Sequence, residues 1–162
     1  MIGSDMLLQT APSLHQLDAT CIGPRLYQGS APNSGSALRN ARFTLVVLCA
    51  KEYQPSSERF PGVHVLHVPF DDSLTPSIGE LRAAAAAADT VAREIRNGGR
   101  VLVTCMAGRN RSGLVTAMAL VALNGWTGDQ AARHIQALRP NALTNTAFVA
   151  FLNTVGSSKR KF

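Results

Sequence analysis

Cys105 and Arg111, two reactive side-chain types separated by five residues, form the part of this chain that most clearly suggests chemistry. They stand between an apolar run at residues 101–104 and another that follows Ser112, so the sequence predicts a strand, a tight loop and a helix. Gly108 lets the loop curl without a Cβ clash. In so short a loop the backbone N–H groups can converge on one centre, which the positive end of the helix also faces. This arrangement favours a phosphate and a thiolate alike, and it predicts Cys105 as a nucleophile beneath a bound phosphate.

The pattern Cys-x5-Arg-Ser-Gly, from Cys105 to Gly113, resembles the signature of the cysteine-dependent protein tyrosine and dual-specificity phosphatases. The resemblance implies hydrolysis of phosphate monoesters through a phosphocysteine intermediate, without a metal or other cofactor. Arg111 would contact two equatorial phosphate oxygens with its planar fork, which a lysine could not replicate. Ser112 would hydrogen-bond the sulfur and help it leave in the second step, or it is simply the N-cap of the helix. The residues expected to bind phosphate are Met106, Ala107, Gly108, Arg109, Asn110 and Arg111.

The acid that protonates the leaving oxygen must come from another part of the chain. Asp71 and Asp72 follow a predicted strand at residues 63–68, and α/β proteins place ligands at the carboxyl ends of their strands. By resemblance to the dual-specificity phosphatases, Asp72 is the general acid and later the base that activates water, with Asp71 as the alternative. The aspartate that is not catalytic is expected to cap the following turn.

Three further positions bear on the nucleophile. Cys49 ends a predicted strand in a segment that resembles the phosphatase-and-tensin-type lipid phosphatases, in which a cysteine at this place can bridge to the nucleophile. Because parallel strands end at one edge of a sheet, Cys49 could lie within disulfide reach of Cys105, or it is a small buried hydrophobe. Thr104 stands where most family members have histidine, and its hydroxyl is expected to replace part of the hydrogen bonding of that histidine in the loop. Arg109 is either a rim contact for a highly anionic substrate or a solvated side chain.

The substrate is predicted less sharply than the reaction. Phosphotyrosine, with phosphoserine and phosphothreonine, is the leading prediction. Residues 46–52 and 69–72 resemble the lipid phosphatases, whereas Gly108–Arg111 resembles the Gly-x-Asn-Arg of the RNA 5′-triphosphatases, so a phosphoinositide or RNA 5′-phosphatase is the alternative. Thr104 motivates a third reading, a catalytically weak module that binds phosphorylated partners.

Length and composition indicate one compact domain in a chain of 162 residues with a formal net charge of +6, which favours anionic partners. The resemblance implies that this is a phosphatase domain. The expected parts are an N-terminal extension at residues 1–21 and a basic C-terminal tail at residues 157–162, which is interpreted as solvated rather than as a nucleic-acid contact. The longest apolar stretch, residues 114–123, is too short to span a bilayer, so a cytoplasmic location is expected.

Three cysteines that lie far apart in the sequence favour reduced thiols over a disulfide framework. No ligand spacing predicts a metal site, so His64, His67 and His134 are interpreted as structural or exposed. The oligomeric state stays open.

The elements that must position these residues alternate between strand and helix and then end in helices. This order predicts a single α/β domain with a central, mostly parallel sheet flanked by helices. The family resemblance implies that this domain has the dual-specificity-phosphatase fold. One helix is expected to begin with Thr75 as N-cap and Pro76 as its first residue, and another with a capping box from Thr127 to Gln130. The predicted strands are 25–28, 43–50, 63–68 and 100–104, and the predicted helices are 36–41, 76–97, 112–124, 128–138 and 145–155.

Overall fold

The computed structural model describes residues 14, 17–33 and 35–156. Within these residues five strands form one sheet in the order β1-β2-β5-β3-β4. The strands β2, β5, β3 and β4 are parallel, and β1 is antiparallel to β2. The prediction of a mostly parallel central sheet is therefore confirmed. The strands are β1 (Ala19–Gly23), β2 (Leu26–Ser30), β3 (Leu45–Ala50), β4 (His64–Phe70) and β5 (Val101–Cys105).

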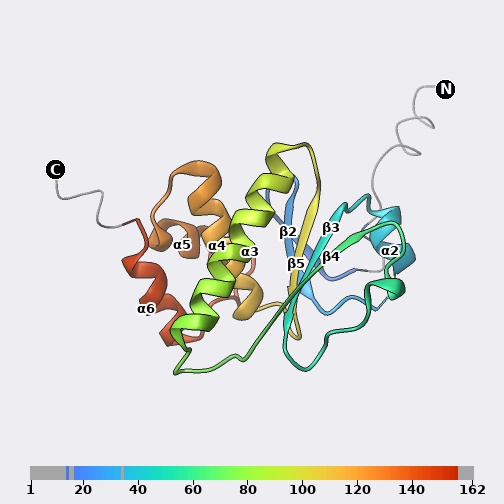
Figure 1. The fold of residues 1–162 in the computed structure, drawn as a ribbon. Helices are drawn as coiled ribbons and strands as arrows, with labels where there is room; N and C mark the ends of the chain where they lie inside the picture. The colour runs from blue at the N-terminus through green and yellow to red at the C-terminus, as the bar shows by residue number, and fades with distance from the viewer. Residues whose placement is uncertain (1–13, 15–16, 34, 157–162) are drawn as a thin grey trace.

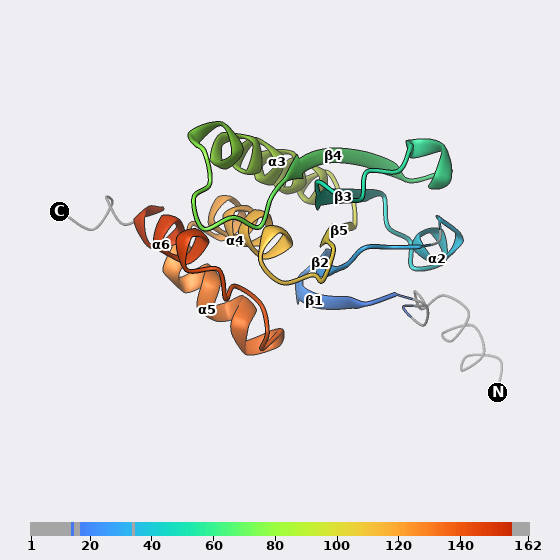
Figure 2. The ribbon, with the colours of Figure 1, turned by 90° about the horizontal axis from the view of Figure 1, so that it is seen from below.

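Helices cover both faces of this sheet, but unequally. Four helices gather on one face, whereas the other face carries α2 (Figures 1 and 2). The four are α3 (Ile78–Arg96), α4 (Arg111–Asn124), α5 (Gly128–Leu138) and α6 (Thr146–Thr154). The other face is covered by the short helix α2 (Gly35–Asn40), and a 3-10 turn, η1 (Ser57–Arg59), precedes β4.

The two middle strands β5 and β3 are buried along their whole length. Their sequences are apolar on both faces, which suits strands that are covered by helices above and below. The larger core lies between the sheet and α3 to α6, and a smaller one lies between the sheet and α2. Because β5 lies between β2 and β3, the loop that follows β5 begins between these two strands, at the carboxyl edge of the sheet.

The start of α3 differs from the prediction. Its N-cap is Ser77, not Thr75, and Pro76 precedes the helix. Ser77 and Glu80 form a reciprocal capping box, in which each side chain accepts from the backbone N–H of the other residue. The N–H of Thr75 instead donates to Ser73 Oγ in the preceding turn. The segment after Asp72 is therefore a longer loop than the sequence pattern predicted.

Strand β1 was not predicted, and residues 19–21 of the expected N-terminal extension belong to the sheet. The strand is a short edge strand with an exposed Cys21, so it lacks the apolar alternation that marks a half-buried strand.

Other predicted boundaries are confirmed: Thr127 and Gln130 form the capping box of α5, and α4 ends at Gly125 with φ of 69°. The basic tail at residues 157–162 lies outside the described residues. No helix within the described part of the chain is long and apolar enough to cross a membrane.

Candidate active site

The predicted nucleophile lies at the bottom of the loop between β5 and α4. Cys105 is 3% exposed, and its Sγ lies 3.2 Å from the Oγ of Ser112, which is itself completely buried. Asn110 is the N-cap of α4 but makes no side-chain cap hydrogen bond. The first residues of α4, Arg111 to Gly113, are nevertheless buried. A buried helix start without a cap leaves backbone N–H groups available to an anion.

The carbonyl groups of the loop are all bonded to partners outside it. Met106 O accepts from the N–H of Ala31, and Gly108 O accepts from Gln28 Nε2 and Arg139 Nε. The carbonyls of residues 107, 109 and 110 have partners as well: Arg139 Nη2 for Ala107, Leu143 N for Arg109 and Leu114 N for Asn110.

In a trans peptide the C=O and the next N–H point in opposite directions. Five carbonyls held outward therefore turn the N–H groups of residues 107–111 toward the inside of the loop. The sequence analysis predicts such a concave ring of donors as a phosphate site.

Arg111 is held in place by a residue that the sequence analysis did not single out. Its Nη1 and Nη2 donate to the two carboxylate oxygens of Glu52 at 2.7 and 2.6 Å, and Nη1 also donates to Phe70 O at 3.2 Å. A guanidinium has five N–H donors, so these bonds leave Nε–H and one N–H of Nη2. Those two donors share one edge of the guanidinium plane, and such an edge can contact two phosphate oxygens at once.

Charge in the site is balanced around Arg111. The hydrogen bonds from Arg111 lower the pKa of Glu52 to about 2, so the Glu52 carboxylate is ionised at neutral pH. The pKa of Arg111 is raised, chiefly by the bond to Glu52 and also by the charges of Cys105 and Asp72. Cys105 and Asp72, the two predicted catalytic groups, therefore lie within electrostatic reach of the Arg111 guanidinium.

Asp72 is in direct contact with the loop, and Asp71 is not. The two oxygens of Asp72 accept from the side-chain amides of Asn145 at 2.7 Å and Asn110 at 2.9 Å. Asp71 instead forms an exposed ion pair with Lys51 at 3.6 Å. Of the two candidate acids, the structure therefore brings Asp72 to the loop, as the sequence analysis preferred.

Cys49 and Thr104 flank the nucleophile from below. Cys49 is fully buried, and burial first and then the charge of Cys105 raise the pKa of its thiol well above the usual value. Thr104 pairs in register with Leu48, and the next residues of these two neighbouring strands are Cys105 and Cys49. The expectation that Thr104 supports the loop is wrong, because its hydroxyl donates to Val47 O on β3 at 2.7 Å.

Arg139 ties the loop to the far edge of the sheet. Its guanidinium contacts Gly108 O at 2.6 Å, Thr20 Oγ1 at 2.9 Å and both carboxylate oxygens of Asp18 at 2.9 and 2.7 Å. The bond to Asp18 is the main reason why the pKa of Arg139 is raised, and the charge of Cys105 contributes to the same shift. Arg139 thus joins the loop to the edge strand β1, and its guanidinium lies within electrostatic reach of Cys105.

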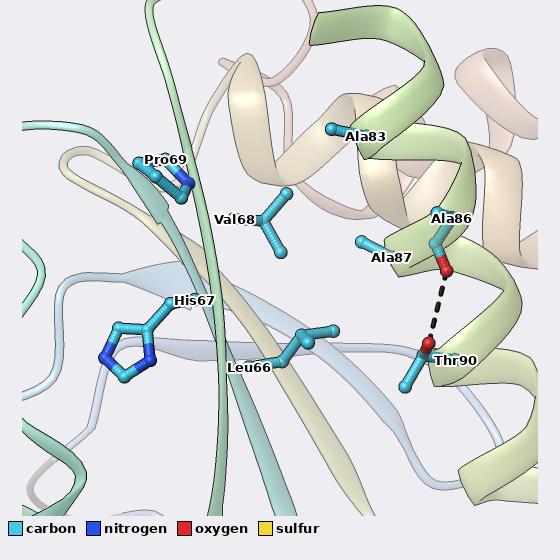
Figure 3. A pocket seen from close by; sticks show the side chains of 8 residues that line it. All are labelled: Leu66, His67, Val68, Pro69, Ala83, Ala86, Ala87 and Thr90. Atoms are coloured by element: carbon cyan, nitrogen blue, oxygen red, sulfur yellow. Dashed lines mark hydrogen bonds between the residues drawn. The ribbon is translucent and has the colours of Figure 1, made fainter. Parts of the chain in front are cut away.

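Other predicted residues lie at the rim or elsewhere. Met106 and Arg109 are exposed at the mouth of the loop. His67 and His134 bond to the backbone carbonyls of Pro55 and Ile22, respectively. A separate pocket of about 290 Å³ lies between β4 and α3, and no predicted site residue lines it (Figure 3). Its walls are mostly apolar: Leu66, His67, Val68, Pro69, Ala83, Ala86, Ala87 and Thr90.

Sequence reasoning missed Glu52, Gln28 and the roles of Arg139 and Asn145. A polar Gln28 inside the apolar segment Leu26–Gly29 was a usable signal, because buried polar side chains normally have a specific partner. Glu52 and Arg139 carried no local signal. They lie 59 and 31 residues away from the loop residues that they contact.

Known proteins resemble this chain in sequence and in fold. Residues 26–158 match the family model of the dual specificity phosphatase catalytic domain. The chain is 35% identical over 134 residues to dual specificity phosphatase 28 of Mus musculus, covering 81% of this chain and 79% of that protein. It is 32% identical over 128 residues to the Homo sapiens protein of the same name, covering 78% and 71%. A crystal structure of a mouse dual specificity phosphatase complexed with zinc tungstate matches with a TM-score of 0.77 and 28% identity, covering 90% and 91% of the two chains.

The family model spans most of the chain, and relatives above 30% identity align over more than two thirds of both sequences. The fold, the loop after β5 and the family match point to the same class of protein. This chain belongs to the dual specificity phosphatase family and is a cysteine-based phosphatase.

Proposed function

We propose that this phosphatase acts on phosphorylated proteins and uses Cys105 as its nucleophile. Its substrates are phosphotyrosine and, as in a dual-specificity enzyme, also phosphoserine and phosphothreonine. The observation that carries the proposal is the way in which four predicted catalytic residues are held at the loop after β5. The Sγ of Cys105 lies 3.2 Å from the Oγ of Ser112, Glu52 holds Arg111, and Asp72 is bonded to the loop residue Asn110.

In the first step the Cys105 thiolate attacks phosphorus, and Asp72 donates a proton to the leaving oxygen as the P–O bond breaks. The loop N–H groups and the open edge of Arg111 stabilise the transferring oxygens. In the second step Asp72 takes a proton from water, which attacks the phosphocysteine. The P–S bond then breaks, and the hydroxyl of Ser112 donates to the departing sulfur.

Phosphate release should be measured in EDTA from phosphotyrosine and phosphothreonine peptides, inositol phosphates and triphosphate-ended RNA. We expect the phosphotyrosine peptide to be hydrolysed, Cys105→Ser to be inactive, and Arg111→Lys to lose roughly 10²-fold or more in turnover. Turnover that persists in Cys105→Ser would falsify the nucleophile assignment. If phosphate is released faster from the RNA or from inositol phosphates than from the peptides, the proposed substrate class is wrong but the proposed mechanism still holds.

Thr104 keeps the weak-module alternative open to test. Because its hydroxyl is bonded to Val47, position 104 gives the loop neither an imidazole nor a hydroxyl. A wild-type protein that binds tungstate but releases no phosphate from any substrate would favour a phosphate-binding module.

A cytoplasmic location belongs to the proposal as well, because the mechanism needs Cys105 as a free thiol and reducing compartments keep thiols free.

A further inference from the structure

Gln28 is a fully buried polar residue of β2 that faces the underside of the loop. Its Nε2 donates to Gly108 O at 3.1 Å and lies 3.5 Å from Arg109 O. The opposite orientation of the amide would set its oxygen against two carbonyl oxygens, so the neighbours fix which end faces the loop. A Cβ added at Gly113 would lie 3.4 Å from Nε2, which means that the amide is packed against the first turn of α4.

The other end of the same amide has no hydrogen bond. Gln28 Oε1 is buried and lacks a hydrogen-bond partner within the described part of the chain. An unpaired buried acceptor destabilises a fold by more than a typical hydrogen bond contributes on balance. An apolar side chain of similar size would avoid this loss. Stability of the fold therefore does not explain why an amide occupies this position.

The contact acts on the peptide that follows the glycine of the loop. Gly108 has φ of 69° and no side chain, so hydrogen bonds rather than side-chain packing restrain the peptide between Gly108 and Arg109. Its carbonyl accepts from Arg139 Nε at 2.6 Å and from Gln28 Nε2 at 3.1 Å. If this peptide turned over, a carbonyl oxygen would replace the Arg109 N–H on the phosphate side. Gln28 Nε2 bonds to the carbonyl of this peptide and also approaches the carbonyl of the next one.

We propose that Gln28 is a positioning residue of the phosphate loop. Its Nε2 keeps the two peptides that follow Gly108 and Arg109 turned so that their N–H groups face the bound phosphate. The inference rests on the proposed function, because it assumes that the loop binds the transferring phosphoryl group.

The test uses Gln28→Met, which removes the donor and keeps a side chain of similar length. Urea unfolding, kcat on an aryl phosphate and the inhibition constant of tungstate should be measured on the full chain. We expect a urea midpoint no lower than that of the wild type, an inhibition constant about tenfold weaker and a lower kcat. Gln28→Leu repeats the comparison with a second apolar side chain, so that a packing fault specific to methionine does not decide the result.

Thr116→Val is the matched control. The hydroxyl of Thr116 is also buried without a hydrogen-bond partner in the described residues, but it lies in α4 and bonds to no loop atom. This variant should be at least as stable as the wild type and should keep its kcat and tungstate inhibition.

Two results would overturn the inference: wild-type kcat and tungstate inhibition in both Gln28 variants, or a lower urea midpoint with unchanged inhibition in the folded protein. Hydrolysis by the wild type and its loss in Cys105→Ser test the proposed function separately. If those hold while the Gln28 variants behave as wild type, only the role of Gln28 fails.

Discussion

The amide of Asn110, a residue of the phosphate loop, donates to the carboxylate of Asp72 at 2.9 Å. The Oδ1 of Asn110 accepts at the same time from the backbone N–H of Asn145, whose own amide donates to Asp72. The loop, the acid and the start of α6 therefore form one hydrogen-bonded unit. The position of Asp72 relative to the loop depends on this unit.

Replacing Asn110 should consequently weaken acid catalysis more than it weakens the fold. In Asn110→Ala we expect turnover of substrates with poor leaving groups to fall about tenfold, and turnover of good ones to fall much less. Rates across a series of aryl phosphates and the thermal midpoint would be measured. Asn153→Ala, at an exposed position of α6, is the control. An equal loss for every leaving group would contradict a role in placing the acid.

The same type of experiment shows whether Asp72 or Asp71 is the general acid. Asp72→Ala should lower the turnover of substrates with poor leaving groups by a factor of about 10² to 10⁴, because general acid catalysis typically contributes that much. Turnover of substrates with good leaving groups should change little. Asp71→Ala loses only an exposed ion pair with Lys51 and should remain near wild type. If the leaving-group dependence appears in Asp71→Ala instead, the acid is assigned to the wrong aspartate.

The Glu52–Arg111 pair predicts a pH-dependent contribution to stability. The pKa of Glu52 in the folded protein, about 2, lies below its ordinary value of 4.5, so the folded state favours the carboxylate. This contribution is fully present above pH 4.5 and is lost as the pH falls toward 2. Glu52→Gln should therefore be less stable than wild type at pH 7, by at most about 1 kcal/mol because the Glu52 side chain is 46% exposed.

The difference between Glu52→Gln and wild type should shrink in urea unfolding at pH 5, 4 and 3. Glu58→Gln, at an exposed position of η1, serves as the control and should show no such trend. A difference that stayed constant over this pH range would mean that the charge of Glu52 does not stabilise the fold.

Cys49 and Cys105 should form a reversible disulfide under mild peroxide. Neighbouring strands lie about 4.8 Å apart, which is within the Cα range of a disulfide, and the two cysteines follow the paired residues Leu48 and Thr104. Peroxide would oxidise the Cys105 thiolate to a sulfenic acid, and the Cys49 thiolate would displace water from it to form the bridge. Because the pKa of Cys49 is raised by burial, bridging should be slow at pH 7 and faster at pH 8.5.

Unreduced peptide maps would show the bridge, and dithiothreitol should restore activity. In Cys49→Ser the same treatment should give sulfinic Cys105 and permanent inactivation. Sulfinic Cys105 beside an unmodified Cys49 in the wild type would leave Cys49 as a buried hydrophobe only.

Local spacing determines most of the predicted site, whereas Asp72 was predicted from its place after a strand and from the family resemblance. Cys105, Arg111 and Ser112 lie within eight residues of one another, so the loop and the helix bring them together without help from the rest of the chain. The N-cap of α3 was also encoded locally, since Glu80 stands three residues after Ser77 but Thr75 has no such partner. Preferring Pro76 at the first helical position led to the wrong cap.

The remaining contacts depend on sheet register and on helix packing. Whether the hydroxyl of Thr104 faces the loop or β3 follows from its pairing with Leu48, which no motif specifies. Glu52 meets Arg111 only because β3 and β5 are neighbours with their carboxyl ends at one edge. The contact of Gln28 with Gly108 depends on tertiary structure in the same way, because the two residues are 80 positions apart in the sequence.

The clamp formed by Asp18, Arg139 and Gly108 also bears on how the enzyme matures. It joins residues that are 121 positions apart, and the peptide orientation in the loop depends on atoms from both halves of the chain. Contacts of such long sequence separation form late, because the entropy of closing the chain must be overcome first. During synthesis the reactive thiol would thus be built well before the ring of donors around it. Catalytic competence should emerge as the final event of folding, only once the segment containing Arg139 has docked.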